Sequence, residues 1–177
     1  MKLVILDRDG TINEDSDQYI KSPEDWRPIK GSLEAIARLT QADYRIVVAT
    51  NQSGIARGLF DTRTLFAIHD TLLRALAQVG GRIDAFFFCP HLPEAGCPCR
   101  KPQPGMLLEA ARRFIVALDE VYMVGDAQRD LEAAAAAGAR PVLVLTGKGV
   151  ATRDEGRLPP GTRVFPDLAA FAAHLAP

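Results

Sequence analysis

Short apolar runs alternate with longer amphipathic segments along most of the chain. β-branched and aromatic runs predict strands at Leu3–Leu6, Ile46–Ala49, Ala85–Phe88, Val121–Val124, Val142–Leu145 and Arg163–Phe165. Apolar residues at helical spacing predict helices over about Ser32–Gln41, Thr62–Val79, Pro104–Ala117, Arg129–Ala137 and Leu168–Leu175. Because strands and helices that alternate in this way are joined by right-handed crossovers, we expect an α/β fold with a doubly wound parallel sheet.

Length and charge limit the kind of protein this can be. A chain of 177 residues can bury one substantial core, so we expect a single domain over residues 1–177 with loop insertions. Its formal net charge of −1 gives no reason to expect a nucleic acid partner. The first apolar run meets Asp7 too early to form a signal peptide or a membrane span, so we expect a cytoplasmic protein with no membrane partner. We also expect a monomer.

Polar clusters follow four of the predicted strands. In an open parallel sheet the ligand crevice lies outside the carboxyl ends of the strands, so clusters that are far apart in sequence should meet there. The candidates are Asp7 and Asp9, then Thr50, Asn51, Gln52 and Ser53, then Arg100 and Lys101, and finally Asp126 and Asp130.

Asp7 and Asp9 are two residues apart, so an extended chain turns both carboxylates to one side and Arg8 to the other. Two adjacent carboxylates repel each other, and a divalent cation would relieve that repulsion. Mg²⁺ is the natural choice because it prefers oxygen ligands. The alternative is that Asp9 and Gly10 form an ordinary turn and that Asp7 only caps the strand.

Groups that could hold phosphate follow the second and third strands. Thr50, Asn51, Gln52 and Ser53 offer hydroxyl and amide donors where the chain turns, although the same residues suit a plain turn. Lys101 precedes a predicted helix, so its charge and the helix N-terminus could face one anion. Its alternative is a solvated surface lysine.

Together these groups would suit phosphoryl transfer through an aspartyl-phosphate. Asp7 is the candidate nucleophile, and Asp9 is the candidate acid and base for the leaving oxygen and the attacking water. Asp126 with Asp130 could complete the Mg²⁺ site with Asp7; the alternative is that Asp126 only caps the following helix.

Three cysteines and a histidine crowd into the loop after the third strand. Cys89, His91, Cys97 and Cys99 form two pairs that could close a tetrahedral structural Zn²⁺ site within a loop at about residues 89–101. The alternative is that three unpaired cysteines share this loop without a ligand. Zinc there would shape the segment that carries Arg100 and Lys101.

These motifs resemble the haloacid-dehalogenase (HAD) superfamily of phosphotransferases. "LDRDGTIN" resembles its first motif, "VVATN" its second, Lys101 its third and "MVGDAQRD" its fourth. The resemblance implies a Rossmann-like core in which Asp7 and Asp126 bind Mg²⁺ through their side chains and Asp9 through its backbone carbonyl. It also implies that Thr50 and Lys101 hold the phosphoryl group and that Arg100 takes part in substrate recognition.

The stretches "TNQSGIARG", "CPCRKPQPGM" and "TGKG" are similar to members that hydrolyse a sugar bisphosphate. Histidinol-phosphate phosphatases share the catalytic set and are the alternative. A receiver domain that is phosphorylated on aspartate as a signal is the alternative from another class, and a zinc-built binding module would leave the acids unexplained. One departure affects the substrate: Ala127 stands where some of these phosphatases carry a lysine.

No segment is long enough for a large cap domain. Trp26 and Tyr19 lie in the insertion after the first motif, which could flank the site, but we expect them to pack. His69 falls in an amphipathic helical run, where a histidine at the edge of the core is the simplest interpretation.

Overall fold

The protein is described here by a computed structural model that covers residues 1–177. Its six strands form one parallel sheet in the order β3-β2-β1-β4-β5-β6. The strands are β1 (Lys2–Leu6), β2 (Tyr44–Asn51), β3 (Ala85–Cys89), β4 (Tyr122–Gly125), β5 (Arg140–Val144) and β6 (Arg163–Phe165). The predicted α/β fold with a parallel sheet is confirmed.

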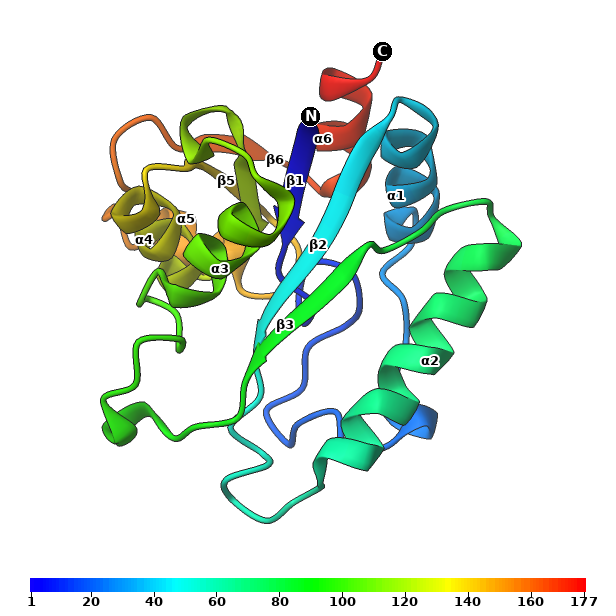
Figure 1. Cartoon of the computed structure of the whole chain (residues 1–177), viewed down its shortest axis with the longest axis vertical. Helices are drawn as coiled ribbons and strands as arrows, with labels where there is room; N and C mark the ends of the chain where they lie inside the picture. The colour runs from blue at the N-terminus through cyan, green and yellow to red at the C-terminus, as the bar shows by residue number, and fades with distance from the viewer.

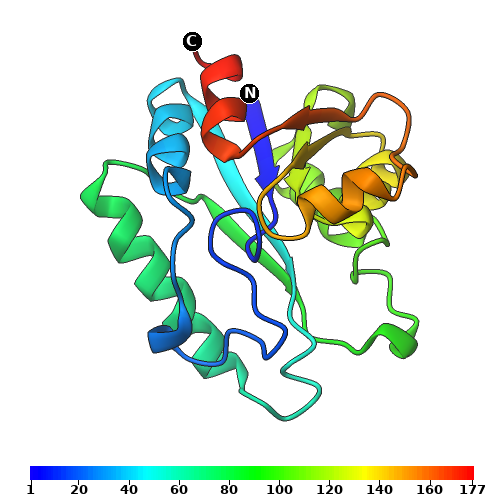
Figure 2. The same ribbon diagram turned by 180° about the vertical axis from the view of Figure 1, so that it is seen from behind.

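Helices cover both faces of the sheet (Figure 1, Figure 2). One face packs against α1 (Ser32–Gln41), α2 (Thr62–Gln78) and α6 (Leu168–Leu175), and the other against α3 (Gly105–Phe114) and α4 (Gln128–Ala137). In β1 the side chains alternate, because Val4 and Leu6 join the first core while Leu3 and Ile5 join the second. A strand buried on both faces therefore leads directly into Asp7.

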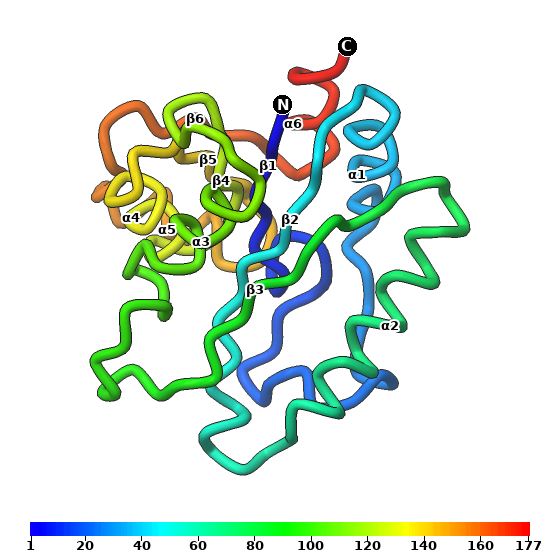
Figure 3. The backbone as a smooth tube through the Cα atoms, in the orientation of Figure 1, coloured from blue at the N-terminus to red at the C-terminus, as the bar shows by residue number.

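The strand order reverses at β1, which pairs with β2 on one side and β4 on the other. This is the switch point at which open α/β sheets place their ligand crevice. The loops after β1, β2 and β3 gather at this end of the sheet, away from the two chain termini (Figure 3). The longest connections, residues 7–31 and 90–104, contain only short 3-10 turns and isolated β-bridges, so no cap domain is inserted there.

Most predicted elements differ from the observed ones by one or two residues at an end, and two differences are larger. The third helix ends at Phe114 instead of Ala117, because Ile115 takes a left-handed conformation (φ 54°) that stops it. A short helix, α5 (Gly149–Asp154), follows β5 where we expected none. Its glycine-rich start and lack of an apolar period hid it from a pattern-based prediction.

Candidate active site

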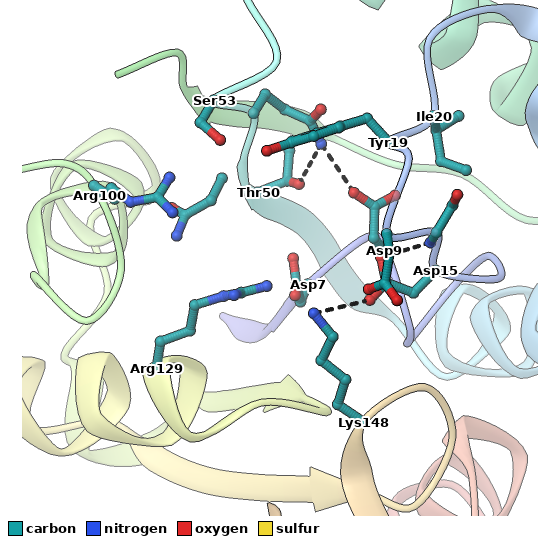
Figure 4. A pocket seen from close by; sticks show the side chains of 14 residues that line it. Asp7, Asp9, Asp15, Tyr19, Ile20, Thr50, Ser53, Arg100, Arg129 and Lys148 are labelled. Carbon is teal, nitrogen blue, oxygen red and sulfur yellow. Dashed lines mark hydrogen bonds and ion pairs between the residues drawn. The ribbon is translucent and has the colours of Figure 1, made fainter. Parts of the chain in front are cut away.

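A polar pocket opens at the carboxyl ends of the central strands (Figure 4). Side chains from the loops after β1, β2 and β3 line it, together with side chains from α4 and the turn before α5. The lining residues are Asp7, Asp9, Asp15, Ser16, Asp17, Tyr19, Ile20, Thr50, Asn51, Gln52, Ser53, Arg100, Arg129 and Lys148. The sequence candidates Lys101, Asp126 and Asp130 are not on this surface but are buried directly behind Asp7.

Asp7 is buried and held from three directions. Its backbone N–H donates to Val124 O on the neighbouring strand (2.8 Å), and Arg8 N donates to its carboxylate (2.7 Å). Lys101 Nζ lies 2.9 Å from Asp7 Oδ1. The carboxylate therefore cannot rotate freely, which is the preorganisation that a nucleophile requires.

Lys101 is fully enclosed and all its donors are used. Besides Asp7, its ammonium contacts Asp130 Oδ1 (2.7 Å) and Ala49 O (2.7 Å). Burial lowers the pKa of Lys101, but the carboxylates of Asp130 and Asp7 outweigh burial and raise it overall. Lys101 is thus held as a cation. Asp130 also accepts from Ala127 N (3.1 Å), so it is Asp130, and not Asp126, that caps α4.

Asp7, Asp126 and Asp130 form a compact buried cluster in which one carboxylate oxygen from each residue lies within 4.8 Å of the other two. Burial and the neighbouring carboxylates raise the pKa of Asp7 to about 6 and that of Asp126 to about 8. Asp126 Oδ2 accepts from Lys148 N (2.7 Å), but its buried Oδ1 has no partner. A cluster with excess negative charge and an unsatisfied carboxylate oxygen fits a bound Mg²⁺ ion.

Two glycines make room for the Asp126 carboxylate. A Cβ on Gly10, which has φ +81°, would lie 2.1 Å from Asp126 Oδ2, and one on Gly147 would lie 2.2 Å from it. The hydroxyl of Thr146 donates to Gly10 O (2.6 Å), so the loop after β5 is fastened to the loop after β1. Both positions therefore require glycine for steric reasons.

Asp9 faces the pocket and is stabilised as an anion. Burial raises its pKa, but the Arg8 guanidinium and hydrogen bonds from Asn13, Arg8 and Gln52 outweigh burial, so the pKa is lowered overall. Its Oδ1 accepts from Arg8 Nε (2.9 Å) and Asn13 Nδ2 (2.9 Å), whereas Oδ2 accepts only from Gln52 Nε2 (3.2 Å). Oδ2 is therefore the oxygen that is free to exchange a proton.

The residues at the end of β2 and just after it have two different roles. Gln52 Nε2 donates to both Asp9 Oδ2 and Thr50 Oγ1 (2.9 Å), so it links Thr50 to Asp9. Asn51, in contrast, uses its side chain to hold Lys101: Nδ2 donates to Lys101 O and Oδ1 accepts from Lys101 N, both at 3.0 Å. Thr50 and Ser53 thus offer hydroxyl groups to a ligand, while Asn51 fixes the loop that carries Lys101.

Three cations face the same pocket. Arg100 and Arg129 approach from one wall and Lys148 from below, where it pairs with Asp15 (3.4 Å) (Figure 4). Neither arginine forms an ion pair, and after burial the charge of Arg129 is the main reason that the pKa of Arg100 is lowered. Two guanidinium groups without carboxylate partners suit a ligand with several phosphate oxygens.

Seven of the lining residues were not predicted as site residues from the sequence: Asp15, Ser16, Asp17, Tyr19, Ile20, Arg129 and Lys148. Tyr19 lines the pocket, whereas Trp26 packs in the core as expected. Arg129 could have been suspected from its place between Asp126 and Asp130, and Lys148 from its place in the "TGKG" stretch. Asp15 has no local signal, because only the path of the loop brings it to Lys148.

The cysteine loop has the dimensions of a metal site. Cys89 Sγ lies 3.6 Å from Cys97 Sγ and 3.1 Å from Cys99 Sγ, and His91 Nδ1 lies 3.4 Å from Cys89 Sγ. A tetrahedral zinc ion with Zn–S bonds of about 2.3 Å would hold its sulfur ligands about 3.8 Å apart. Burial raises the pKa of the Cys89 thiol to about 12, so a cation is needed to hold it as a thiolate. The donor set fits structural zinc.

The loop leads straight into the active site. Cys89 O accepts from Gln52 N (2.7 Å), and Pro98 O accepts from Gly105 N at the start of α3 (3.0 Å). Arg100 and Lys101 lie between these two attachments. The loop therefore fixes the backbone from which Lys101 contacts Asp7 and Arg100 enters the pocket.

Comparison with known proteins places the chain in a family. A model of the HAD-hydrolase-like family matches residues 98–171. Over 175 residues the chain is 62% identical to the D-glycero-β-D-manno-heptose-1,7-bisphosphate 7-phosphatase of Bordetella bronchiseptica, which covers 99% of this chain and 98% of the relative. The chain belongs to this family of HAD phosphatases. The corresponding protein of Pseudomonas putida is 54% identical, with 99% of each chain covered.

Solved structures of the family agree with this fold. The crystal structure of the B. bronchiseptica D,D-heptose 1,7-bisphosphate phosphatase, complexed with magnesium and phosphate, matches with a TM-score of 0.98 over 99% of this chain and 98% of that one. The enzyme from Burkholderia thailandensis is 52% identical and matches with a TM-score of 0.80 over the same shares. No helix of this chain has the length and apolar character needed to cross a membrane.

Proposed function

We propose that this protein is a Mg²⁺-dependent phosphatase that hydrolyses the C7 phosphate of D-glycero-D-manno-heptose 1,7-bisphosphate, a step toward nucleotide-activated heptose. It works as one domain, as a monomer in the cytoplasm, without a nucleic acid or membrane partner. The observation that carries the proposal is the 62% identity to a phosphatase of that name over nearly the whole chain. The pocket supports it, because it joins a buried aspartate to cations that suit a phosphorylated substrate.

Asp7 is the nucleophile in the proposed reaction. A carboxylate oxygen of Asp7 attacks phosphorus, and the bond between phosphorus and the C7 oxygen breaks. Lys101, fixed by Asp130 and Ala49 O, offsets negative charge beside the reacting group. The product of this step is an aspartyl-phosphate and an alcohol.

Asp9 moves the proton in both halves of the reaction. It gives a proton to the departing C7 oxygen, then takes one from the water that attacks the aspartyl-phosphate and releases inorganic phosphate. The lowered pKa of Asp9 suits the second half, in which it acts as a base. Binding of a phosphate dianion next to Asp9 raises its pKa, and this prepares it for the first half.

Asp7 and Asp126 would hold Mg²⁺ through their carboxylates, and Asp9 through its backbone carbonyl. When bound, the ion supplies positive charge that offsets the phosphoryl oxygens. Asp130 contributes indirectly, since its carboxylate is bonded to Lys101 and to the start of α4. Cys89, His91, Cys97 and Cys99 would hold Zn²⁺, which would supply no chemistry but would keep the loop that carries Arg100 and Lys101 in place.

The second phosphate of the substrate would meet the pocket wall that carries Arg100. Arg100 is half-buried and donates only to His91 O, at 3.4 Å. Thr50, Gln52 and Ser53 face the phosphoryl side of the pocket. Because no cap domain covers the site, selection depends on these loop residues and on the bulk of the substrate itself.

The decisive test is phosphate release from heptose 1,7-bisphosphate by purified protein with Mg²⁺, alongside histidinol phosphate. We expect a kcat/KM at least about 100-fold higher for the heptose substrate. Asp7→Asn should abolish turnover while the circular dichroism spectrum stays unchanged. A higher kcat/KM on histidinol phosphate would establish the alternative phosphatase, and near-normal turnover by Asp7→Asn would refute the nucleophile.

The receiver-domain alternative makes a different prediction. A receiver would accumulate a stable phosphorylated Asp7 with little turnover, whereas the proposed enzyme turns over many times because Asp9 is placed to activate water. A receiver also has no use for the cysteine loop that positions Arg100 and Lys101. Rapid multiple turnover excludes it.

A further inference from the structure

The side chain of Arg8 lies behind the pocket and all of it is buried. Its Nε and Nη2 atoms each lie 2.9 Å from Asp9 Oδ1. Its remaining nitrogen, Nη1, lies 3.3 Å from Nε2 of His69, a residue on α2 that is 61 positions away in the chain. Arg8 thus connects a helix on one face of the sheet to the carboxylate of Asp9.

His69 must act as the acceptor in this contact. A guanidinium group has only donors, so Nε2 of His69 carries the lone pair and the ring proton sits on Nδ1. Burial and the charge of Arg8 lower the pKa of His69 to about 3, which keeps the ring neutral. The ring also stacks on Phe86 of β3, with centroids 4.1 Å apart and planes 13° apart. His69 is therefore fixed both in its orientation and in its protonation state.

The orientation of Asp9 follows from this chain of contacts. Arg8 and Asn13 both bind Oδ1, so they hold the carboxylate with Oδ2 turned to the pocket and to Gln52. Arg8 has only two side-chain partners, Asp9 and His69, so without His69 its buried Nη1 would be left unsatisfied and the side chain would shift to find another acceptor. Any such shift would rotate Asp9, because two of the Arg8 nitrogens contact that one oxygen.

We propose that His69 is a positioning residue for the general acid: through Arg8 it holds Asp9 with Oδ2 aimed at the leaving oxygen. The inference rests on the proposed function, in which Asp9 moves the proton. It gives α2 and β3 a part in the chemistry, although neither element contributes a catalytic residue. It also explains why a histidine occupies a position that is only 4% exposed in an otherwise apolar helix face.

Two variants of His69 distinguish the effect of its hydrogen bond with Arg8 from the effect of its stacking on Phe86. His69→Phe keeps an aromatic ring against Phe86 but removes the acceptor, whereas His69→Gln removes the ring but places a carbonyl oxygen where Nε2 was. Leu72→Ala is the matched control, because Leu72 is buried on the same helix and belongs to the apolar core. Leu72→Ala should lower the melting temperature without changing how kcat/KM depends on the leaving group of the substrate.

The measurement is kcat/KM on two substrates with different leaving groups. The alcohol leaving group of heptose bisphosphate needs a proton from Asp9, but the p-nitrophenolate of p-nitrophenyl phosphate is stable without one. For His69→Phe we expect kcat/KM to fall about 10- to 100-fold on heptose bisphosphate and less than about threefold on the aryl substrate. His69→Gln should recover to within about threefold of the wild type on both.

Equal losses on the two substrates, or no loss in His69→Phe, would overturn the inference. If His69→Phe does not fold, Arg8→Lys replaces it, since an ammonium on a shorter side chain cannot reach both Asp9 and His69. Asp9→Asn distinguishes a failure of the proposed mechanism from a failure of the role of His69 alone. If it retains turnover of heptose bisphosphate the proposed mechanism fails, whereas if it loses turnover while His69→Phe does not, only the role of His69 fails.

Discussion

Lys101 Nζ lies 2.9 Å from Asp7 Oδ1, and both side chains are almost completely buried. The same ammonium contacts Asp130, so a single cation compensates two carboxylates. An ion pair of this kind adds little stability relative to apolar side chains, but the loss of one partner is costly. The pair is therefore better explained by the charge that it brings to the reacting group than by folding.

Replacing Lys101 with methionine should impair both stability and activity. The change leaves Asp7 and Asp130 buried without their cation, so we expect a loss of about 3–5 kcal/mol in unfolding free energy at pH 8 and a kcat at least about 100-fold lower. The stability loss should shrink at pH 5, where the carboxylates can take up protons. Urea unfolding at both pH values measures it, with the exposed Lys30→Met as control. An equal loss at pH 5 and pH 8 would contradict the electrostatic cause.

The acidic cluster predicts a pH-dependent stability in the metal-free protein. Folding raises the pKa of Asp126 to about 8, so above the unfolded-state pKa the folded protein binds more protons, and stability is lost as pH rises through 8. His69, with its folded-state pKa lowered to about 3, has the opposite effect, but only below its unfolded-state pKa of about 6.5. The interval from pH 7 to pH 8.5 therefore excludes the titration of His69, and a comparison with Asp126→Asn separates the cluster from Cys97, whose pKa is lowered to about 6.

In EDTA we expect the melting temperature to fall between pH 7 and pH 8.5. Mg²⁺ should raise it, and by more at pH 8.5 than at pH 7, because the ion binds the ionised carboxylates. Asp126→Asn should flatten the profile and abolish the Mg²⁺ effect. A melting temperature in EDTA that does not change across this interval would show that the cluster is not strained by its charge.

The cysteine loop predicts a metal-dependent link between stability and substrate binding. Cys97→Ser removes one of four ligands, so zinc content should fall well below one per chain and the melting temperature should drop. KM should rise because Arg100 and Lys101 follow within the same loop. Elemental analysis, thermal unfolding and kinetics measure these effects, with the exposed Glu94→Gln in the same loop as control. Unchanged zinc content with unchanged stability would refute the site.

The position of Arg129 in the pocket predicts that it contributes to substrate binding, although it was not among the sequence candidates. It faces the pocket without an ion-pair partner, and its Nε is buried without a hydrogen bond. Removing one charge-assisted contact with phosphate by Arg129→Ala should raise KM for heptose bisphosphate about tenfold and change kcat less than about threefold. Arg113→Ala, on the exposed side of α3, is the control. A KM equal to that of the control would remove Arg129 from the binding site.

Sequence reasoning reached the parts of the site that depend on sheet topology. Asp7, Thr50 and Asp126 each follow a buried strand, and the ends of parallel strands must meet at one edge. The sequence did not predict which side chains contact one another. Asn51 was expected to donate to phosphate, yet it binds the Lys101 backbone 50 residues away, and no local pattern encodes that pairing.

His69 illustrates the same limit from the core. The helical period showed that it lies on the apolar face of its helix, but not that Arg8 would be its partner. Whether Arg129 faces the pocket depends on how α4 is rotated about its axis. The neighbouring Ala127 is buried, but its side chain is too short to indicate that rotation from the sequence. In both cases the fold could be predicted, whereas the direction in which a long side chain extends had to be seen.

The cysteine loop follows β3, the strand at the edge of the sheet, whereas Asp7 and Asp126 follow the two central strands. Insertions or deletions in an edge loop leave the pairing of the central strands intact. Evolution or protein engineering could therefore exchange this segment and obtain an enzyme that accepts a different phosphate ester with the same hydrolytic chemistry. Variants with grafted loops of different length at residues 90–100 could be screened for enzymes that dephosphorylate other metabolites.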